Sequence, residues 1–280
     1  ISGPTGDISG TFSAPGGTIK VSTINTAALI DNILRINSDA RFYARGVNQV
    51  TDDILNNEFV LEPLSGGSIS FSADGTLMME EGVLVDVSGS EMITSYRMAS
   101  GGQLIAYDSA GQPGSVSLSF FKGTNDSGES LIQADFIANK SLNATQGGTF
   151  SLKKTDGSVE YALDPDLVDN LEAGGFDHFS LETPAGISYS GNQTIDMARG
   201  IVLETPAISA EEGAQLVLNT SWLQMVNDSD FPGGASSGGG ALFTANADFI
   251  DLEGQLAFSG MDHVTLNASQ DIRLTDRYYT

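Results

Sequence analysis

A glycine pair followed by a short apolar/polar alternation recurs along this 280-residue chain. The copies begin at Gly16, Gly66, Gly101 and Gly147, and the second reads Gly-Gly-Ser-Ile-Ser-Phe. Two glycines form a tight turn that other residues enter only at a cost, and the period-two alternation is typical of a β-strand. Strands this short cannot bury a face alone, but stacked copies of one unit can. The repeat therefore predicts an all-β solenoid.

One coil of this solenoid can be outlined between residues 68 and 87. Three strands are predicted at 68–71, 76–79 and 83–87, separated by turns, which gives a coil of about 20–25 residues. Because each coil lies above the last, the strand pairing is predicted to be parallel, with Leu104 and Leu181 pointing inward. The remaining predicted strands are 18–22, 34–44, 103–107, 115–121, 131–137, 149–153, 179–182, 187–190, 194–197, 201–204, 215–219, 222–226, 242–245, 249–252, 256–258, 264–267 and 272–274.

Two segments interrupt the repeat. Residues 155–175 contain a short helix near 165–173, since Asp164 suits the N-cap, Pro165 the first turn and Gly174-Gly175 the exit. We interpret this segment as a surface excursion. Residues 227–240 are polar and glycine-rich and predict a mobile loop. Residues 1–280 are accordingly expected to form a single elongated domain.

Composition limits the classes of partner that the chain can bind and bears on its export and on whether it is a fragment. The net charge of -24 disfavours nucleic acid and anionic membrane surfaces, and no apolar run approaches the roughly 20 residues that span a bilayer. There is no cysteine, which excludes disulfides and thiolate metal sites and suits a chain that crosses a membrane unfolded. The chain begins at Ile1 rather than Met, which favours a fragment of a longer protein.

Several phrases recur along the chain in a recognisable order: Ser13-Ala14-Pro15-Gly16-Gly17, residues 66–73, residues 82–89, residues 174–177 and Asp271-Ile272-Arg273-Leu274. These phrases resemble the filamentous haemagglutinin-type exoproteins, the large passengers of bacterial two-partner secretion. The resemblance runs from about residue 10 to 275 and implies a right-handed parallel β-helix that is exported through an outer-membrane transporter and is secreted or held at the cell surface. It also implies adhesion, biofilm matrix formation or a stalk role, and no shared catalytic motif.

The candidate chemical groups are few. His178 and His263 each follow an Asp within similar phrases, and we expect them to occupy equivalent positions several coils apart, with a structural role. Calcium requires several converging oxygens, but no acidic cluster has the spaced Asp loop of a calcium site, so solvated turns are expected and no cofactor is assigned. Calcium stays open as the one alternative. The clusters are Asp52-Asp53, Glu80-Glu81, Asp164 with Asp166 and Asp169, Glu211-Glu212, and Asp228 with Asp230.

These features favour a non-catalytic bacterial adhesin or matrix segment that contacts glycans or proteins on other cells. A passive stalk of a contact-dependent toxin and a polysaccharide-active enzyme on the same fold are the alternatives, although no carboxylate pair recurs at coil spacing with an Arg. Aromatic residues 107, 120, 121 and 222 are expected mainly in the core. The residues predicted to contact a ligand lie in two loops: Asn125, Asp126, Asp228, Asp230 and Phe231.

Overall fold

The chain is mostly β, with 61% of residues in strands and 4% in helix, which confirms the all-β prediction. The computed structural model describes residues 2–3, 6–23, 32–53, 58–98, 103–124, 130–227, 236 and 238–275. Outside two hairpins, every pairing between named strands is parallel, as a stacked repeat requires. No helix in this part of the chain is long and apolar enough to cross a membrane.

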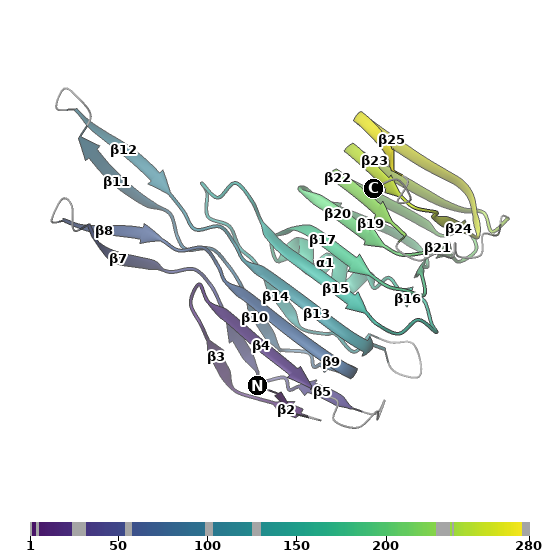
Figure 1. The fold of residues 1–280 in the computed structure, drawn as a ribbon, viewed down its shortest axis with the longest axis horizontal. Helices are drawn as coiled ribbons and strands as arrows, with labels where there is room; N and C mark the ends of the chain where they lie inside the picture. The colour runs from purple at the N-terminus through teal and green to yellow at the C-terminus, as the bar shows by residue number, and fades with distance from the viewer. Residues whose placement is uncertain are drawn as a thin grey trace.

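A 13-stranded sheet runs the length of the molecule (Figure 1). Some strands are long enough to belong to two stacks of paired strands. The first half of β9 pairs with β4 and β13, and its second half pairs with β5. The strands are β1 (Ser2–Gly3), β2 (Gly6–Ile8), β4 (Thr18–Thr23), β5 (Ile33–Ile36), β9 (Ser68–Met79), β13 (Ser115–Lys122), β15 (Gly148–Lys154), β17 (Phe176–Glu182), β19 (Asn192–Met197), β20 (Gly200–Glu204), β22 (Gln215–Val226), β23 (Ala241–Glu253) and β25 (Met261–Thr275).

Two four-stranded parallel sheets accompany the long sheet. The chain passes through the sheets in turn, for example β2, β3 and β4 and then β5, β6 and β9, and each pass pairs with the pass before it. The first small sheet holds β3 (Thr11–Ser13), β6 (Arg41–Tyr43), β10 (Leu84–Asp86) and β14 (Asp135–Ile137). The second holds β16 (Tyr161–Ala162), β18 (Ile187–Tyr189), β21 (Ala207–Ala210) and β24 (Ala257–Ser259).

The core consists of ladders of apolar side chains that are in register across the strands. Alternate residues of each strand point inward, so parallel pairing without a shift places apolar residues beside apolar residues. One ladder joins Phe71, Leu118, Leu152, Leu181 and Leu203, which are all buried. The inward position predicted for Leu181 is therefore confirmed.

Two antiparallel hairpins, which the alternation in the sequence did not predict, project from the stack (Figure 1). They are β7 (Asn48–Asp53) with β8 (Glu58–Pro63), and β11 (Ile93–Met98) with β12 (Leu104–Ser109). The strand predicted at 103–107 belongs to the second hairpin, where Leu104 pairs antiparallel with Met98. The predicted place of this strand within the stack is therefore wrong, because a hairpin strand and a stacked strand share the same alternation.

The third repeat that stacks in register is β13, which follows Pro113-Gly114 rather than Gly101-Gly102. Gly101 and Gly102 lie outside the described residues. A β-carbon at residue 114 would overlap the carbonyl oxygen of Gly67, so the close stacking of this corner needs glycine there. A single glycine at the point of contact, and not a glycine pair, is what this position requires.

Helix α1 (Pro165–Ala173) confirms the predicted short helix. The Asp164 carboxylate caps it by accepting hydrogen bonds from the backbone N–H groups of Asp166 and Leu167. Its buried face, Leu167, Val168 and Leu171, belongs to the main core. The helix packs against β14 and β19, where the stack would otherwise hold a strand, so it is more than a surface excursion.

Candidate functional site

The outward positions of four neighbouring strands form a flat array of hydroxyl groups, which we name the hydroxyl grid. The strands are β4, β9, β13 and β15, and their intervening residues, such as Phe71, Leu118 and Phe150, are buried. The grid comprises Thr18, Ser22, Ser68, Ser70, Ser72, Ser115, Ser117, Ser119, Thr149 and Ser151, with Lys20 and Lys153 as its charged members.

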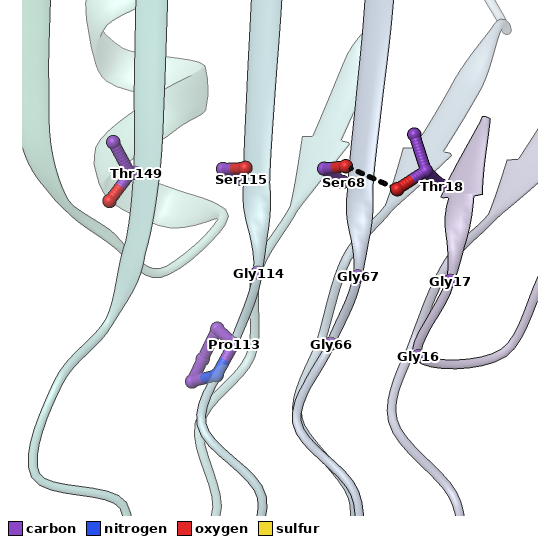
Figure 2. A pocket seen from close by; sticks show the side chains of 10 residues that line it. All are labelled: Gly16, Gly17, Thr18, Gly66, Gly67, Ser68, Pro113, Gly114, Ser115 and Thr149. Atoms are coloured by element: carbon purple, nitrogen blue, oxygen red, sulfur yellow. Dashed lines mark hydrogen bonds between the residues drawn. The ribbon is translucent and has the colours of Figure 1, made fainter. Parts of the chain in front are cut away.

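The grid has a regular spacing because the strands pair without a shift over these residues. Thr18, Ser68, Ser115 and Thr149 form one row across the strands. Neighbouring strands lie about 4.8 Å apart, and alternate residues of a strand lie about 6.6 Å apart. Thr18 and Ser68 share a hydrogen bond of 3.0 Å between their hydroxyl groups (Figure 2). The surface presents donors and acceptors at regular intervals in both directions.

A trough of about 440 Å³ borders this row of hydroxyl groups (Figure 2). Its floor has almost no side chains because it is built from Gly16, Gly17, Gly66, Gly67 and Gly114, with Pro113 beside them. A β-carbon at Gly67 would overlap the carbonyl oxygen of Gly17, so close contact between turns forces glycine here. The trough follows the direction in which the strands stack.

The hydroxyl grid is free of acidic residues although the chain carries a net charge of -24. Its Lys153 forms an ion pair with Glu182 of the next strand, and the hydrogen bond to Glu182, which outweighs desolvation, raises the pKa of Lys153. Glu182 therefore borders the grid, and no carboxylate lies within it. A ligand rich in hydroxyl groups can approach it without repulsion.

On the same outward surface, aromatic and charged side chains take the place of the hydroxyl groups toward β22, β23 and β25. There Trp222 donates a hydrogen bond from Nε1 to Asp251 Oδ2 at 2.7 Å, and Arg273 donates two hydrogen bonds to the same carboxylate. Burial alone would raise the pKa of Asp251, but the hydrogen bonds from Arg273 and Trp222 outweigh it and lower that pKa. Trp222 is partly exposed, so its expected place in the core is wrong.

The other aromatic residues named from the sequence have different positions. Phe120 is fully buried, as expected, and Phe121 is partly exposed. Tyr107 lies on the β11–β12 hairpin and is 49% exposed, so its expected place in the core is also wrong. A residue on a hairpin that leaves the stack has no core to enter.

A second cavity, of about 420 Å³, lies at the ends of β15, β17 and β20. Its lining includes Lys153, Glu182 and Glu204, and two Thr-Pro turns at Thr183-Pro184 and Thr205-Pro206. These turns belong to the phrase Leu-Glu-Thr-Pro-Ala, which occurs twice in the sequence. That exact repeat in the sequence identifies this corner, whereas the glycine pairs do not.

A third cavity, a groove of about 850 Å³, lies beside the start of α1. Glu80, Glu81, Asp164 and Asp166 contribute to its lining, which joins two of the acidic clusters seen in the sequence. The Asp164 carboxylate already caps the helix, and Glu80 accepts a hydrogen bond from the backbone N–H of Ser38. Within the described ranges, no three His, Cys, Asp or Glu residues are placed to hold a metal ion.

The two histidines do not occupy equivalent positions, contrary to the expectation from their similar phrases. His178 in β17 is in register with Thr149 and Gly200, whereas His263 in β25 is in register with Leu242. The stack that contains His178 continues to the second halves of the last strands, and His263 lies in their first halves. Desolvation and the nearby Arg199 lower the pKa of His178.

The loop residues predicted to contact a ligand, Asn125, Asp126, Asp228, Asp230 and Phe231, lie outside the described residues. Among the described residues, the candidate site is the outer face of the long sheet. Comparison of the chain with family models, curated proteins and solved structures finds no match.

Proposed function

We propose that this chain is a non-catalytic, secreted or surface-exposed bacterial adhesin or matrix segment that binds glycans through the outer face of its long sheet. The observation that carries this proposal is the hydroxyl grid with its glycine-floored trough. A flat array of hydroxyl donors and acceptors without any carboxylate suits a polymer that carries many hydroxyl groups. The trough leaves room for such a chain along the direction of stacking.

We also propose that the sheets close into a right-handed parallel β-helix. The support is the sequence of passes through three stacks, each pass pairing in parallel with the previous one. The resemblance to filamentous haemagglutinin-type exoproteins favours the same fold, export by an outer-membrane transporter and a place within a longer protein. Partners in this proposal are glycans or surface proteins of other cells.

The first test is binding of the purified 280-residue chain to immobilised dextran, mannan, xyloglucan, alginate and hyaluronan, with and without calcium. Saturable, selective binding is the expected result, and a calcium-dependent signal would reopen the cation alternative. Absence of binding by a folded sample would favour the stalk alternative. Release of reducing ends from any polysaccharide would instead favour a carbohydrate-active enzyme and would overturn the non-catalytic part of the proposal.

A further inference from the structure

Two aromatic side chains lie next to each other on the outward surface of the carboxyl-terminal strands. Trp222 of β22 and Phe249 of β23 are register partners, so their backbones are about 4.8 Å apart. The residue after each of them, Leu223 and Ile250, is fully buried, and the alternation of a strand therefore directs Trp222 and Phe249 outward. Phe249 is 43% exposed. These rings contribute little to the core that their neighbours fill.

The indole ring of Trp222 is held in place by polar neighbours. Its N–H donates to Asp251, and Asp251 is bound in turn by Arg273 through both carboxylate oxygens. The network spans β22, β23 and β25, so three strands fix the orientation of one ring. A ring that is already fixed loses little conformational freedom when a ligand packs on it.

Polar groups lie beside the two rings on the same strands and on the neighbouring strand β25. Gln224 is the register partner of Asp251, and Asp271 is the register partner of Phe249. An aromatic platform bordered by amide and carboxylate groups suits a sugar ring, whose C–H face packs on the aromatic ring while its hydroxyl groups make hydrogen bonds. We infer that Trp222 and Phe249 form a binding subsite for a neutral pyranose ring of a polysaccharide.

Charge selects neutral sugars over anionic ones at this subsite. Asp271 and Asp248 are exposed carboxylates close to the two rings, whereas the Arg273 guanidinium is already paired with Asp251. A uronate or sulfate group would meet net negative charge here. This inference rests on the proposed glycan-binding function and adds to it the position and the chemical class of one contact.

The chain contains a single tryptophan, so its fluorescence reports on Trp222 alone. The experiment titrates the folded chain with cellohexaose, mannohexaose and chitohexaose, and with hexagalacturonic acid as the anionic comparison. We expect a saturable change of tryptophan emission with at least one neutral hexaose and none with the anionic one. F249A should weaken that apparent affinity by about tenfold.

Tyr107→Ala provides the matched control, because Tyr107 is a similarly exposed aromatic residue on a projecting hairpin. Y107A should bind the neutral hexaose like the unmodified chain, and melting curves of both variants should match it. The inference is overturned if polysaccharides bind in the panel while tryptophan emission stays constant, or if F249A and Y107A bind equally well. A chain that binds no polysaccharide at all would overturn the proposed function together with this subsite.

Discussion

The Glu172 side chain accepts a hydrogen bond of 2.7 Å from the backbone N–H of Asp196, so a helix side chain replaces a neighbouring strand at the edge of β19. On the other side of α1, the side-chain oxygen of Asn170 accepts a hydrogen bond from the backbone N–H of Phe136 in β14. Two side chains of one short helix thus accept hydrogen bonds from the backbone of the strands on both of its sides. This arrangement lets the stack continue past a helix without leaving backbone donors unpaired.

Glu172→Gln should leave the free energy of unfolding at pH 7 unchanged or raise it. Desolvation raises the pKa of Glu172, so the folded state holds its proton more tightly and the charged form at pH 7 is disfavoured. The amide oxygen of Gln still accepts the bond from Asp196 and carries no charge. Glu172→Ala removes the acceptor and should lower stability. Urea melts at pH 7 of both variants distinguish the acceptor from the charge, and an equal loss in both would contradict this role.

Leu181→Asp should destabilise the fold by about 3–5 kcal/mol, because it leaves a buried charge without a partner. Leu181 is fully buried between Leu152 and Leu203 of the neighbouring strands. Ser180→Asp, one residue earlier on the outward side, should change stability by no more than about 0.5 kcal/mol. Thermal melts of the two variants test the inward/outward assignment, which fails if they melt alike.

Gly67→Ala should lower stability by about 1–3 kcal/mol or more through overpacking. The new β-carbon would overlap the Gly17 carbonyl oxygen, and its three nearest neighbours are all backbone atoms of Gly17, which cannot move aside as a side chain can. Gly157→Ala is the control, since a β-carbon there meets nothing closer than Pro184 at 3.7 Å. Chemical denaturation of both variants measures the effect. A Gly67→Ala protein as stable as the control would refute close stacking at this corner.

The fold could be predicted in its class because alternation and glycine turns directly reflect how parallel strands stack. Local pattern could not separate β12 from a stacked strand, since an antiparallel hairpin has the same period. It did identify α1, whose cap residues act within a few positions of each other. The role of Glu172 could not be predicted, because its partner Asp196 is brought near only by stacking.

The candidate site was harder to predict than the fold. A serine on a strand is unremarkable by itself, and the hydroxyl grid exists only because Ser70, Ser117 and Ser151 come into register from distant segments. The similar phrases around His178 and His263 suggested equivalent positions, but the stack places them in different rows. Similarity between two short stretches of sequence does not determine their register when a strand is long enough to belong to two stacks.

His178 should make stability depend on pH below neutrality. Its folded pKa lies below the ordinary value of 6.5, so the unfolded state binds more protons as pH falls through that region. Its contribution is fully present above about 6.5 and is lost toward the lower folded value. The stability lost between pH 7.5 and pH 5.5 should be smaller in His178→Gln than in the unmodified chain. Equal losses would contradict the burial of a neutral imidazole.

The most direct test of glycan binding through the outer face is the affinity of a Ser70→Asp/Ser117→Asp double variant for the polysaccharide that the unmodified chain binds best. Both serines point outward and are register partners at the centre of the hydroxyl grid, so the variant should fold normally while adding negative charge to a surface that contains no carboxylate. The account predicts a loss of affinity of at least tenfold with an unchanged melting temperature. Undiminished binding by the folded variant would show that the hydroxyl grid is not the surface that holds the glycan.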